Sequence, residues 1–185
     1  MKIAKKTKRY AMVIDSRKCI DCKACVVACK AENQVPEGVF RNRINVERSG
    51  DYPRLRMNFE PEQCHHCDEP SCVRVCPTGA SFQREDGIVL VNYDDCIGCK
   101  YCIIACPYEA RYHHPETHTV DKCTFCVHRV DKGDVPACVE TCPSKVRVFG
   151  DLNDPKSPLH QLLATRRHEV KNPQTGNGPQ LYYLF

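Results

Sequence analysis

The chain has 185 residues, a formal net charge of +4 and no tryptophan. This length accommodates one or two domains, and no apolar run approaches the roughly 18 residues that a membrane-spanning helix needs. Sixteen cysteines make up about 9% of the residues, a content at which cross-links or metal sites replace part of a hydrophobic core. These values exclude a collagen, a coiled coil and a chain that crosses a membrane.

The N-terminal segment is basic, and we interpret it as a solvated arm because a short run of like charges has no apolar face to bury. Its basic residues are Lys2, Lys5, Lys6, Lys8 and Arg9. The apolar stretch 11–14 that follows is too short for the hydrophobic region of a secretory signal, and no twin arginine precedes it. We therefore expect this chain to carry no export signal of its own.

Taken in chain order, the cysteines form four groups of four with none left over. Group one is Cys19, Cys22, Cys25 and Cys29; group two is Cys64, Cys67, Cys72 and Cys76; group three is Cys96, Cys99, Cys102 and Cys106; group four is Cys123, Cys126, Cys138 and Cys142. A proline follows groups two, three and four, whereas Lys30 follows group one. The segments KCIDCKACVVACKAE and DCIGCKYCIIACPYE align without a gap, so groups one and three are an internal duplication.

The segments between and after these groups predict connecting elements. Side-chain character alternates along VFRNRINVER in residues 36–59. The turn residues SGDYP and a second run, RLRMNF, follow, so the segment is predicted to be a β-ribbon insertion. Asp86 and Gly87 predict a hairpin turn before a strand that includes residues 88–91. Residues 151–185 are predicted to be a C-terminal docking arm with a short helix in LHQLLATRR. Its apolar end, LYYLF, is too short to fold alone and either packs back as a strand or docks on a partner.

Three kinds of chemistry use cysteines at this density. Disulfides need an oxidising compartment, and C-x2-C-x2-C triplets are poorly suited to their geometry. Structural zinc binds four thiolates, usually from two separated C-x2-C pairs, and only group four fits that pattern. The run C-x2-C-x2-C-x3-C-P is typical of ferredoxins with two 4Fe–4S clusters, in which the fourth cysteine binds the other cluster. The spacing therefore predicts four 4Fe–4S clusters with all sixteen cysteines as iron ligands; one 3Fe–4S cluster is the alternative.

Groups two and three lie close together in the sequence, so we expect them to share one two-cluster unit and leave groups one and four for the other. Crossed ligation then gives four sets of ligands. Set one is Cys19, Cys22, Cys25 and Cys142; set two is Cys123, Cys126, Cys138 and Cys29; set three is Cys96, Cys99, Cys102 and Cys76; set four is Cys64, Cys67, Cys72 and Cys106. The predicted fold is α+β, with bacterial-ferredoxin-like module one over 10–35 plus 115–150, the β-ribbon over 36–59, ferredoxin-like module two over 60–114 and the docking arm over 151–185.

With these motifs identified, the chain from about Tyr10 to Phe185 resembles the four-cluster iron–sulfur subunits of the membrane-bound molybdopterin oxidoreductases. The likeness is greatest to the iron–sulfur subunit of polysulfide and thiosulfate reductases. It rests on the four ordered cysteine groups and on EQCHHCDEPSCVRVCPTGAS, CPYEARYHHP, DKCTFCVHR, PACVETCP and FGDLNDP.

The resemblance implies a non-catalytic relay of single electrons between a molybdopterin catalytic subunit, faced by module one, and a polytopic quinone-binding membrane subunit, faced by module two. In some relatives, tryptophan replaces the second cysteine of group three and the cluster there lacks one iron. This chain has Cys99 at that position, which implies four intact clusters. The resemblance also implies a peripheral position on the cytoplasmic membrane, on its periplasmic face or alternatively its cytoplasmic face. Neither binding of nucleic acid nor a membrane span of its own is expected.

Several alternatives stay open at this point. The same relay occurs in soluble formate dehydrogenase or hydrogenase complexes, and in reductases of tetrathionate, arsenate, selenate, nitrite or dimethyl sulfoxide. A structural metal protein without redox function is a further class. The chain shows no Ser/His/Asp arrangement, no P-loop and no G-x-G-x-x-G, so we expect no substrate chemistry from it.

Basic, histidine and tyrosine side chains flank the cysteines. Four basic residues lie beside cluster cysteines: Lys23, Lys100, Lys122 and Arg129. Their positive charge would favour the reduced form of a nearby cluster. The alternative is that they are simply solvated surface residues. A hydrogen bond to cluster sulfur or proton handling near the quinone is one interpretation of His65 and His66. The commoner interpretation of such histidines is a surface or interface position. The same interpretation applies to His113, His114 and His128. Packing is expected for Tyr101, Tyr108, Tyr182 and Tyr183.

Overall fold

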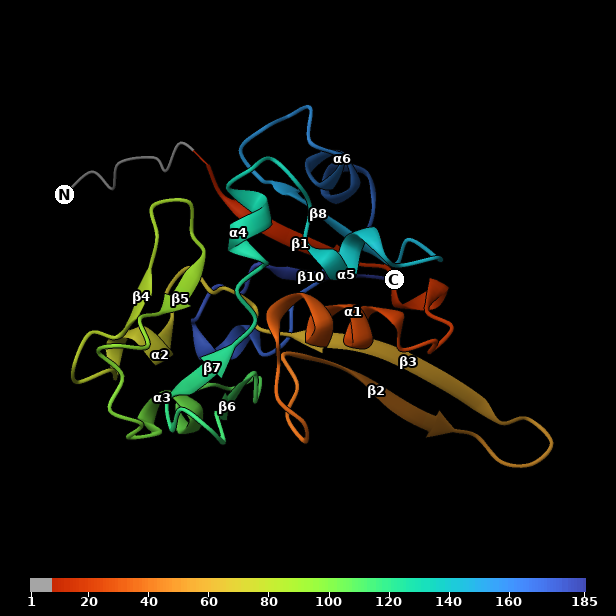
Figure 1. Cartoon of the computed structure of the whole chain (residues 1–185). Coiled ribbons are helices and arrows are strands. Elements are labelled where there is room, and N and C mark those ends of the chain that lie inside the picture. Colours follow the sequence, from red (N-terminus) through yellow and green to blue (C-terminus); the bar gives the residue numbers. More distant parts are fainter. Residues whose placement is uncertain (1–7) are drawn as a thin grey trace.

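The computed structural model describes residues 8–185 (Figure 1). Lys2, Lys5 and Lys6 of the basic N-terminal cluster lie outside the described residues. Within residues 8–185, no helix has the length and apolar character needed to cross a membrane.

A four-stranded sheet joins the two ends of the chain. Its strand order is β8 (Arg147–Asp151), β1 (Tyr10–Ile14), β10 (Leu181–Leu184) and β9 (His168–Glu169). Strand β1 runs antiparallel to β8 and parallel to β10, so that Met12 lies opposite both Phe149 and Leu181. The central strand is thus built from residues that precede every cysteine and pairs with strands that follow all of them.

The two faces of this sheet are covered by different layers. Because side chains alternate along a strand, Met12 and Ile14 of β1 face the core that contains the cysteines. Ala11 and Val13 face the other way, where they pack with Leu159 of helix α6 (Pro158–Thr165). All four of these β1 side chains are buried, which explains why YAMVI is a nearly continuous apolar run and not an alternating one.

Residues 151–185 do not form the separate docking arm that the sequence predicts. Strand β10 lies inside the sheet, between β1 and β9, and Leu181 and Tyr183 are buried in the core. The alternative that LYYLF packs back as a strand is confirmed. The reason is that four residues of high β-propensity bury their apolar side chains only when a sheet supplies both neighbouring strands.

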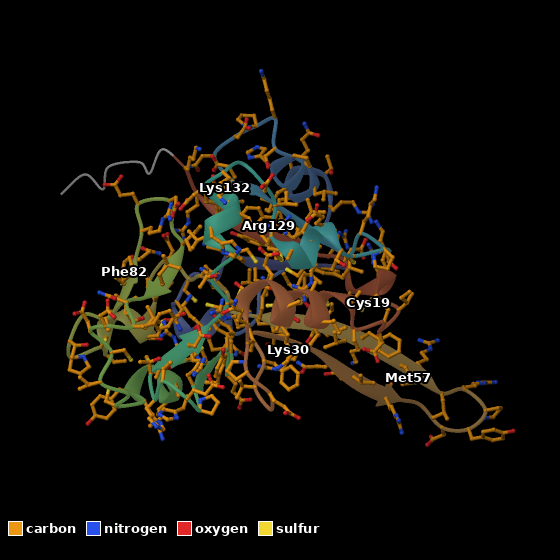
Figure 2. All side chains as sticks on the ribbon, viewed as in Figure 1. Cys19, Lys30, Met57, Phe82, Arg129 and Lys132 are labelled. Atoms are coloured by element: carbon orange, nitrogen blue, oxygen red, sulfur yellow. The ribbon has the colours of Figure 1, made fainter. Side chains whose placement is uncertain are left out.

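The predicted β-ribbon is confirmed, with a shift in its bounds. Strand β2 (Asn42–Ser49) pairs antiparallel with β3 (Arg56–Gln63) along its whole length. Figure 1 shows this ribbon extending away from the body, and Figure 2 shows Met57 on its outer half. The second strand continues to Gln63, four residues into the predicted module two, because Gln63 is buried in the body.

Two smaller ribbons and five helices support the loops in which most of the cysteines lie. Strand β4 (Ser81–Gln83) pairs with β5 (Val89–Val91) through the predicted hairpin, and β6 (Arg111–His113) pairs with β7 (Val120–Lys122). The β6–β7 pairing spans the predicted boundary between residues 114 and 115, so the two modules are continuous at that point. The helices are α1 (Ala24–Asn33), α2 (Ser71–Arg74), α3 (Tyr101–Ile104), α4 (Val127–Val130) and α5 (Ala137–Glu140); short 3-10 turns cover Ser16–Lys18 and Pro173–Thr175.

Arg9 corrects the prediction of a solvated basic arm. It is only 7% exposed, and its guanidinium pairs with Asp68 at 2.7 Å. Its main-chain N–H donates to the carboxylate of Asp151. A buried cation needs such a partner, and both partners come from distant parts of the chain, so the run of charge in the sequence could not reveal them.

Candidate functional site

The cysteine loops of groups one and three have the same backbone conformation. Asp21 and Lys23 in the first loop, and Gly98 and Lys100 in the second, all have φ between 56° and 66°. Residues in this left-handed conformation turn successive N–H groups toward one side and form a concavity that attracts anions, including iron–sulfur clusters. At Gly98 the chain also passes the carbonyl of His118 so closely that an added Cβ would lie 2.4 Å from its oxygen. The duplication seen in the sequence is therefore a duplication of loop geometry.

The structure brings the sixteen cysteines together around four hollows. One hollow is lined by Cys19, Cys22, Cys25 and Cys142, a second by Cys29, Cys123, Cys126 and Cys138, a third by Cys76, Cys96, Cys99 and Cys102, and a fourth by Cys64, Cys67, Cys72 and Cys106. The empty space in and at the mouth of each hollow, open solvent included, is about 260 to 320 Å³. These are the same four combinations as sets one to four above, including the exchange of the fourth cysteine between groups.

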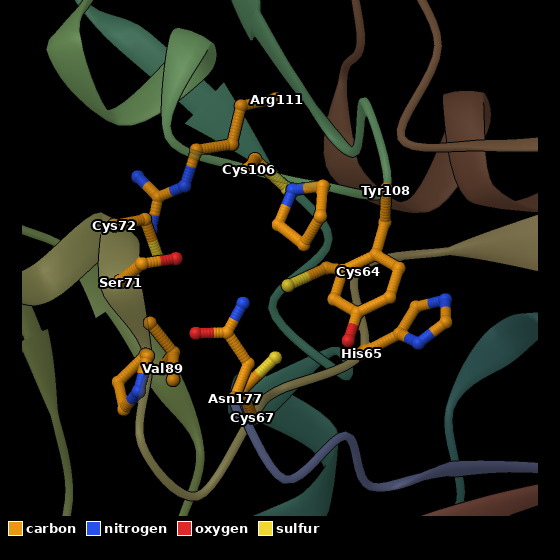
Figure 3. A pocket seen from close by; sticks show the side chains of 12 residues that line it. Cys64, His65, Cys67, Ser71, Cys72, Val89, Cys106, Tyr108, Arg111 and Asn177 are labelled. Atoms are coloured by element: carbon orange, nitrogen blue, oxygen red, sulfur yellow. The ribbon is translucent and has the colours of Figure 1, made fainter. Parts of the chain in front are cut away.

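The hollow of set four shows how the thiols are presented. In Figure 3 the thiols of Cys64 and Cys67 are directed into an open space, with the guanidinium of Arg111 and the amide of Asn177 at its edge. No disulfide joins any of the sixteen cysteines. Among residues 8–185, no three His, Cys, Asp or Glu side chains are arranged to hold a single metal ion. Thiols that surround a space without converging on one point suit a cluster of several irons.

Main-chain N–H groups point at the sulfurs of these sets. The N–H of Val146 lies 3.4 Å from Cys142 Sγ in set one, and that of Phe125 lies 3.4 Å from Cys123 Sγ in set two. In set three, the N–H of Ser81 lies 3.4 Å from Cys76 Sγ. Hydrogen bonds of this kind stabilise thiolate charge and help to set the potential of an iron–sulfur cluster.

Burial of these thiols raises their pKa values. The pKa of Cys29 rises to about 12 and that of Cys138 to about 11, in each case chiefly because burial disfavours the thiolate. A thiol with such a pKa stays protonated at neutral pH unless a cation takes the proton's place. Iron does so, because a coordinating thiol is deprotonated outright. Both thiols belong to set two, where thiolates would need a bound cation to offset their burial.

Unpartnered polar atoms at the hollow of set four support the same fit. Nε and Nη1 of Arg111, both ring nitrogens of His65 and Oδ1 of Asn177 are buried without a hydrogen-bond partner. Buried polar groups are usually paired. All three residues line this hollow, and the N–H groups of Arg111 are available to the sulfurs of a cluster held there.

The four sets form a row in space. Three pairs of thiols from different sets lie within electrostatic reach of each other: Cys25 and Cys138 link set one to set two, Cys64 and Cys123 link set two to set four, and Cys72 and Cys102 link set four to set three. Arg111 lines the hollows of both set four and set three. The spatial order is therefore one, two, four, three.

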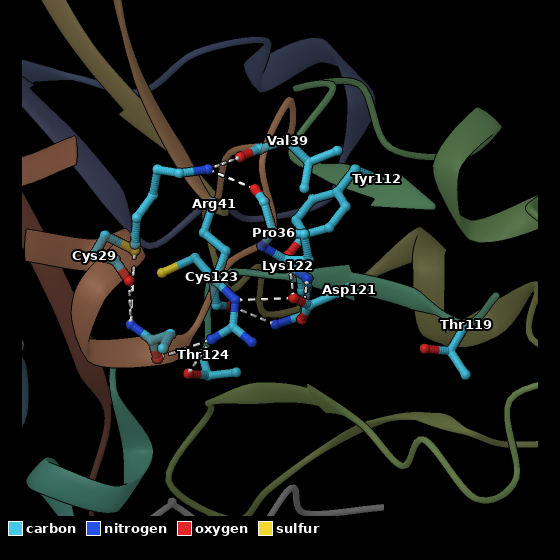
Figure 4. Close-up of polar contacts among 12 residues, drawn as sticks. Cys29, Pro36, Val39, Arg41, Tyr112, Thr119, Asp121, Lys122, Cys123 and Thr124 are labelled. Carbon is cyan, nitrogen blue, oxygen red and sulfur yellow. Dashed lines mark hydrogen bonds and ion pairs between the residues drawn. The ribbon is translucent and has the colours of Figure 1, made fainter. Parts of the chain in front are cut away.

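Lys30 explains the departure of group one from the pattern. Helices α2, α3 and α5 end before the fourth cysteine of their groups, which a proline then follows, whereas α1 continues past Cys29 to Asn33. The ammonium group of Lys30 donates to the carbonyls of Pro36 and Val39 at 2.6 and 2.9 Å. Figure 4 labels these two acceptors and draws both hydrogen bonds as dashed lines. The extra turn brings the Asn33 amide to 3.7 Å from Cys29 Sγ. No pattern in the sequence indicates this second role of the longer helix.

His65 and His66 are not the surface residues that the commoner interpretation expects. They are 1% and 0% exposed and stack on Tyr108 and Phe125, respectively, with ring centroids 3.7 Å apart. The ring of His66 accepts a hydrogen bond from the Val89 N–H. Both rings therefore pack inside the core. The surface interpretation holds for His128, whereas His113 and His114 are half-buried.

The tyrosines and basic residues that flank the cysteines also divide into buried and exposed ones. Tyr108 and Tyr183 are buried as expected for packing, Tyr182 is half-buried, and Tyr101 is 60% exposed. Of the four basic residues, Lys122 is fully buried, while Lys100 is exposed. Carboxylates offset the remaining two charges: Lys23 pairs with Asp21, and Arg129 pairs with Glu32 and Glu140.

Comparison with known proteins agrees with this architecture. Residues 18–80 and 55–152 each match a family described as a 4Fe-4S dicluster domain. The chain is 49% identical to one subunit of the tetrathionate reductase of Salmonella typhimurium over 181 residues, which cover 95% of this chain and 72% of the relative. It is 44% identical to one subunit of the polysulfide reductase of Wolinella succinogenes over 180 residues, 96% and 94% of the two chains. Protein NrfC of Escherichia coli is 49% identical over 177 residues, 94% and 79% of the two chains.

Paired dicluster domains with sixteen cysteines around four hollows define an iron–sulfur electron-transfer protein. Its cofactors are four 4Fe–4S clusters. Within this class, the chain belongs to the family of iron–sulfur electron-transfer subunits of the molybdopterin oxidoreductases.

Proposed function

We propose that this chain relays single electrons between a molybdopterin catalytic subunit and a quinone-binding membrane subunit. The observation that carries the proposal is the continuous row of four cysteine-lined hollows. When bound, each 4Fe–4S cluster supplies one-electron chemistry at a potential set by nearby charge, hydrogen bonds and burial. The protein's part is to hold four such sites in order and to enclose the inner ones.

The proposed iron ligands are the cysteines of sets one to four. At the two ends of the row, Cys22 of set one and Cys99 of set three are exposed. Two residues before each of these cysteines lies a strongly exposed isoleucine: Ile20 is 63% exposed and Ile97 is 68% exposed. Exposed apolar side chains beside a redox site suit contact with a partner protein. Set two, in the middle of the row, has all four of its cysteines buried. Electrons would therefore enter and leave the protein through sets one and three.

The orientation in a complex follows from the same order. We propose that module one, residues 10–35 and 115–150, faces the catalytic subunit through set one, and that module two, residues 60–114, faces the membrane subunit through set three. The proposed place of the chain is peripheral, on the periplasmic face of the cytoplasmic membrane. Relatives that are named as subunits of reductases support a place for the chain in such a complex. Protease treatment of spheroplasts tests the side: cleavage of the chain in intact spheroplasts is expected, and protection until lysis would overturn it.

The proposed substrate of the complex is a compound with sulfur–sulfur bonds, of the polysulfide or thiosulfate type. Tetrathionate and polysulfide, the substrates in the names of two of the relatives above, share this bond. In membranes that contain the complex, oxidation of a quinol should depend on added polysulfide, thiosulfate or tetrathionate. Oxidation that responds only to selenate, nitrite or dimethyl sulfoxide would refute the assignment of substrate and leave the relay intact.

The relay itself is tested by metal content and spectroscopy. The chain is purified anaerobically with its partner subunits and reduced with dithionite. We expect about sixteen irons and sixteen acid-labile sulfides per chain, with spin-coupled 4Fe–4S signals in electron paramagnetic resonance. About four zinc ions without sulfide would overturn the proposal and leave a structural metal protein.

A further inference from the structure

Two buried arginines occupy equivalent positions in the two halves of the protein. Arg111 lies five residues after Cys106 in CPYEAR, and Arg147 lies five residues after Cys142 in CPSKVR. Each is the first residue of the strand that follows the fourth cysteine of its group, β6 for Arg111 and β8 for Arg147. They are 6% and 2% exposed. Group two, in contrast, has Ser81 at this position and group one has Gln34.

Each arginine contacts the third cysteine of one set. Nη2 of Arg111 donates to Cys72 Sγ at 2.9 Å in set four, and to the hydroxyl of Ser81 at 2.8 Å. Nη2 of Arg147 lies 4.0 Å from Cys25 Sγ in set one, while its Nη1 donates to Gln63 Oε1 at 2.5 Å. Neither side chain has a carboxylate partner among these contacts, so the cysteine sulfurs are the groups that would carry negative charge beside each guanidinium once a cluster is bound.

Each arginine also lies toward the neighbouring set. Arg111 lines the hollow of set three as well as that of set four, and the charge of Cys102 in set three acts on it. Arg147 lies within electrostatic reach of Cys138 and Cys123 in set two, in addition to Cys25 in set one. A guanidinium does not lose its proton in a protein, so both positions carry a permanent charge.

The third junction in the row, between sets two and four, holds Lys122. It is fully buried, but its ammonium group donates to the main-chain carbonyls of Val89 and Cys123. None of its hydrogen bonds is to a thiol. We therefore confine the inference to the two arginines, whose geometry is aimed at sulfur and whose positions are repeated in the two halves.

We propose that Arg111 and Arg147 each raise the reduction potentials of two neighbouring clusters, Arg111 those of sets four and three and Arg147 those of sets one and two. The physical reason is that reduction adds one negative charge to a cluster, and a fixed positive charge in a medium of low dielectric constant stabilises that charge. A cation between two sites also offsets the repulsion between two electrons on adjacent clusters. This inference rests on the proposed function, because it requires clusters in all four sets.

The test is a redox titration of the full-length protein with its clusters, followed by electron paramagnetic resonance. The four midpoint potentials are measured in the wild type and in Arg111→Gln, Arg111→Lys, Arg147→Gln and Arg147→Lys. In each glutamine variant, we expect the equilibrium constant for one-electron reduction to fall at least tenfold for two clusters, a shift of about 59 mV. The two potentials lowered in Arg111→Gln should be those that Arg147→Gln leaves in place. The lysine variants keep the charge and should recover most of each shift.

Arg84→Gln is the matched control. Arg84 pairs with Asp86 and Asp131 and lines none of the four hollows, so all four potentials should stay at their wild-type values. Full iron and sulfide content with unchanged potentials in both glutamine variants would overturn the inference while leaving the relay intact. So would equal shifts of all four potentials, or lysine variants that behave like the glutamine ones. Absence of iron and sulfide from the wild type would instead refute the proposed function. If one glutamine variant fails to assemble, the other still decides.

Discussion

Substitution of Lys30 by proline tests why group one lacks the proline of the other groups. Lys30 lies inside α1, which continues to Asn33. Proline at this position would remove the hydrogen bond from its N–H to the carbonyl four residues earlier and would clash with that carbonyl, at a cost of about 3 kcal/mol or more. It would also remove the two hydrogen bonds that the ammonium group donates to Pro36 and Val39.

A second variant separates the two effects. Lys30→Met keeps the helix. Like Lys30→Pro, it loses the contact of the ammonium group with the ring of Phe40 and its two hydrogen bonds, each worth about 1.5 to 3 kcal/mol and less here because the side chain is half-buried. The difference between Lys30→Pro and Lys30→Met should therefore be about 3 kcal/mol. For a chain of this size, that corresponds to a fall in melting temperature of about 6 to 12 °C.

The assay is thermal unfolding of both variants under anaerobic conditions, with iron content measured before each scan. The shortened helix should also move the Asn33 amide away from Cys29 and Cys126, which lie 3.7 Å from it, so set two should lose iron most readily. Equal melting temperatures and equal iron content in the two variants would refute the argument. They would mean that the last turn of α1 contributes no stability.

Three further predictions concern the core, the ligands and the dependence on pH. Leu159→Ala should cost about 2 to 5 kcal/mol by opening a cavity against the central sheet, while Leu55→Ala on the exposed ribbon should change the unfolding free energy by less than about 0.5 kcal/mol; equal losses in denaturant titrations would contradict the packing described. Cys29→Ser should disturb the cluster held by the group-four cysteines and spare the one held by the rest of its own group, because Cys29 lines the hollow of set two; electron paramagnetic resonance that shows the reverse would exclude crossed ligation. A hydrogen bond from Arg17 holds the pKa of Asp15 below its ordinary value, so the pair stabilises the protein above about pH 4 and this contribution is lost as pH falls further. Asp15→Asn should lower stability at pH 7 by less than about 1 kcal/mol, since Arg17 is half exposed, and melting curves of variant and wild type should converge in acid; a constant difference at all pH values would contradict this.

The row of sites has one consequence for how the protein responds to damage. Sets one and three lie at its ends, where Cys22 and Cys99 are exposed, whereas set two is buried. Exposure governs how readily a thiolate or a cluster meets oxidants. The terminal sites are thus the points at which the relay both exchanges electrons and meets solvent.

The sequence determined the chemistry of this protein because three of the four cysteines of each set come from one group in the sequence. Three cysteines on one short loop, and a fourth about one turn beyond, leave few alternatives to a cluster, and repetition of the pattern predicts four of them. Local pattern was also sufficient for the ribbon that begins at Asn42 and for the hairpin at Gly87, since alternation and turn residues act between neighbours.

Only the tertiary structure decided the features that join distant residues. The last strand of the chain completes the central sheet beside β1, Arg9 becomes a buried ion pair, and His65 is enclosed in the core. The tertiary structure alone also decides that Arg111 and Arg147 lie between successive cysteine sets. Each depends on which surfaces meet when segments far apart in the sequence pack together, and burial of a charge or a ring has no periodic signature in the sequence.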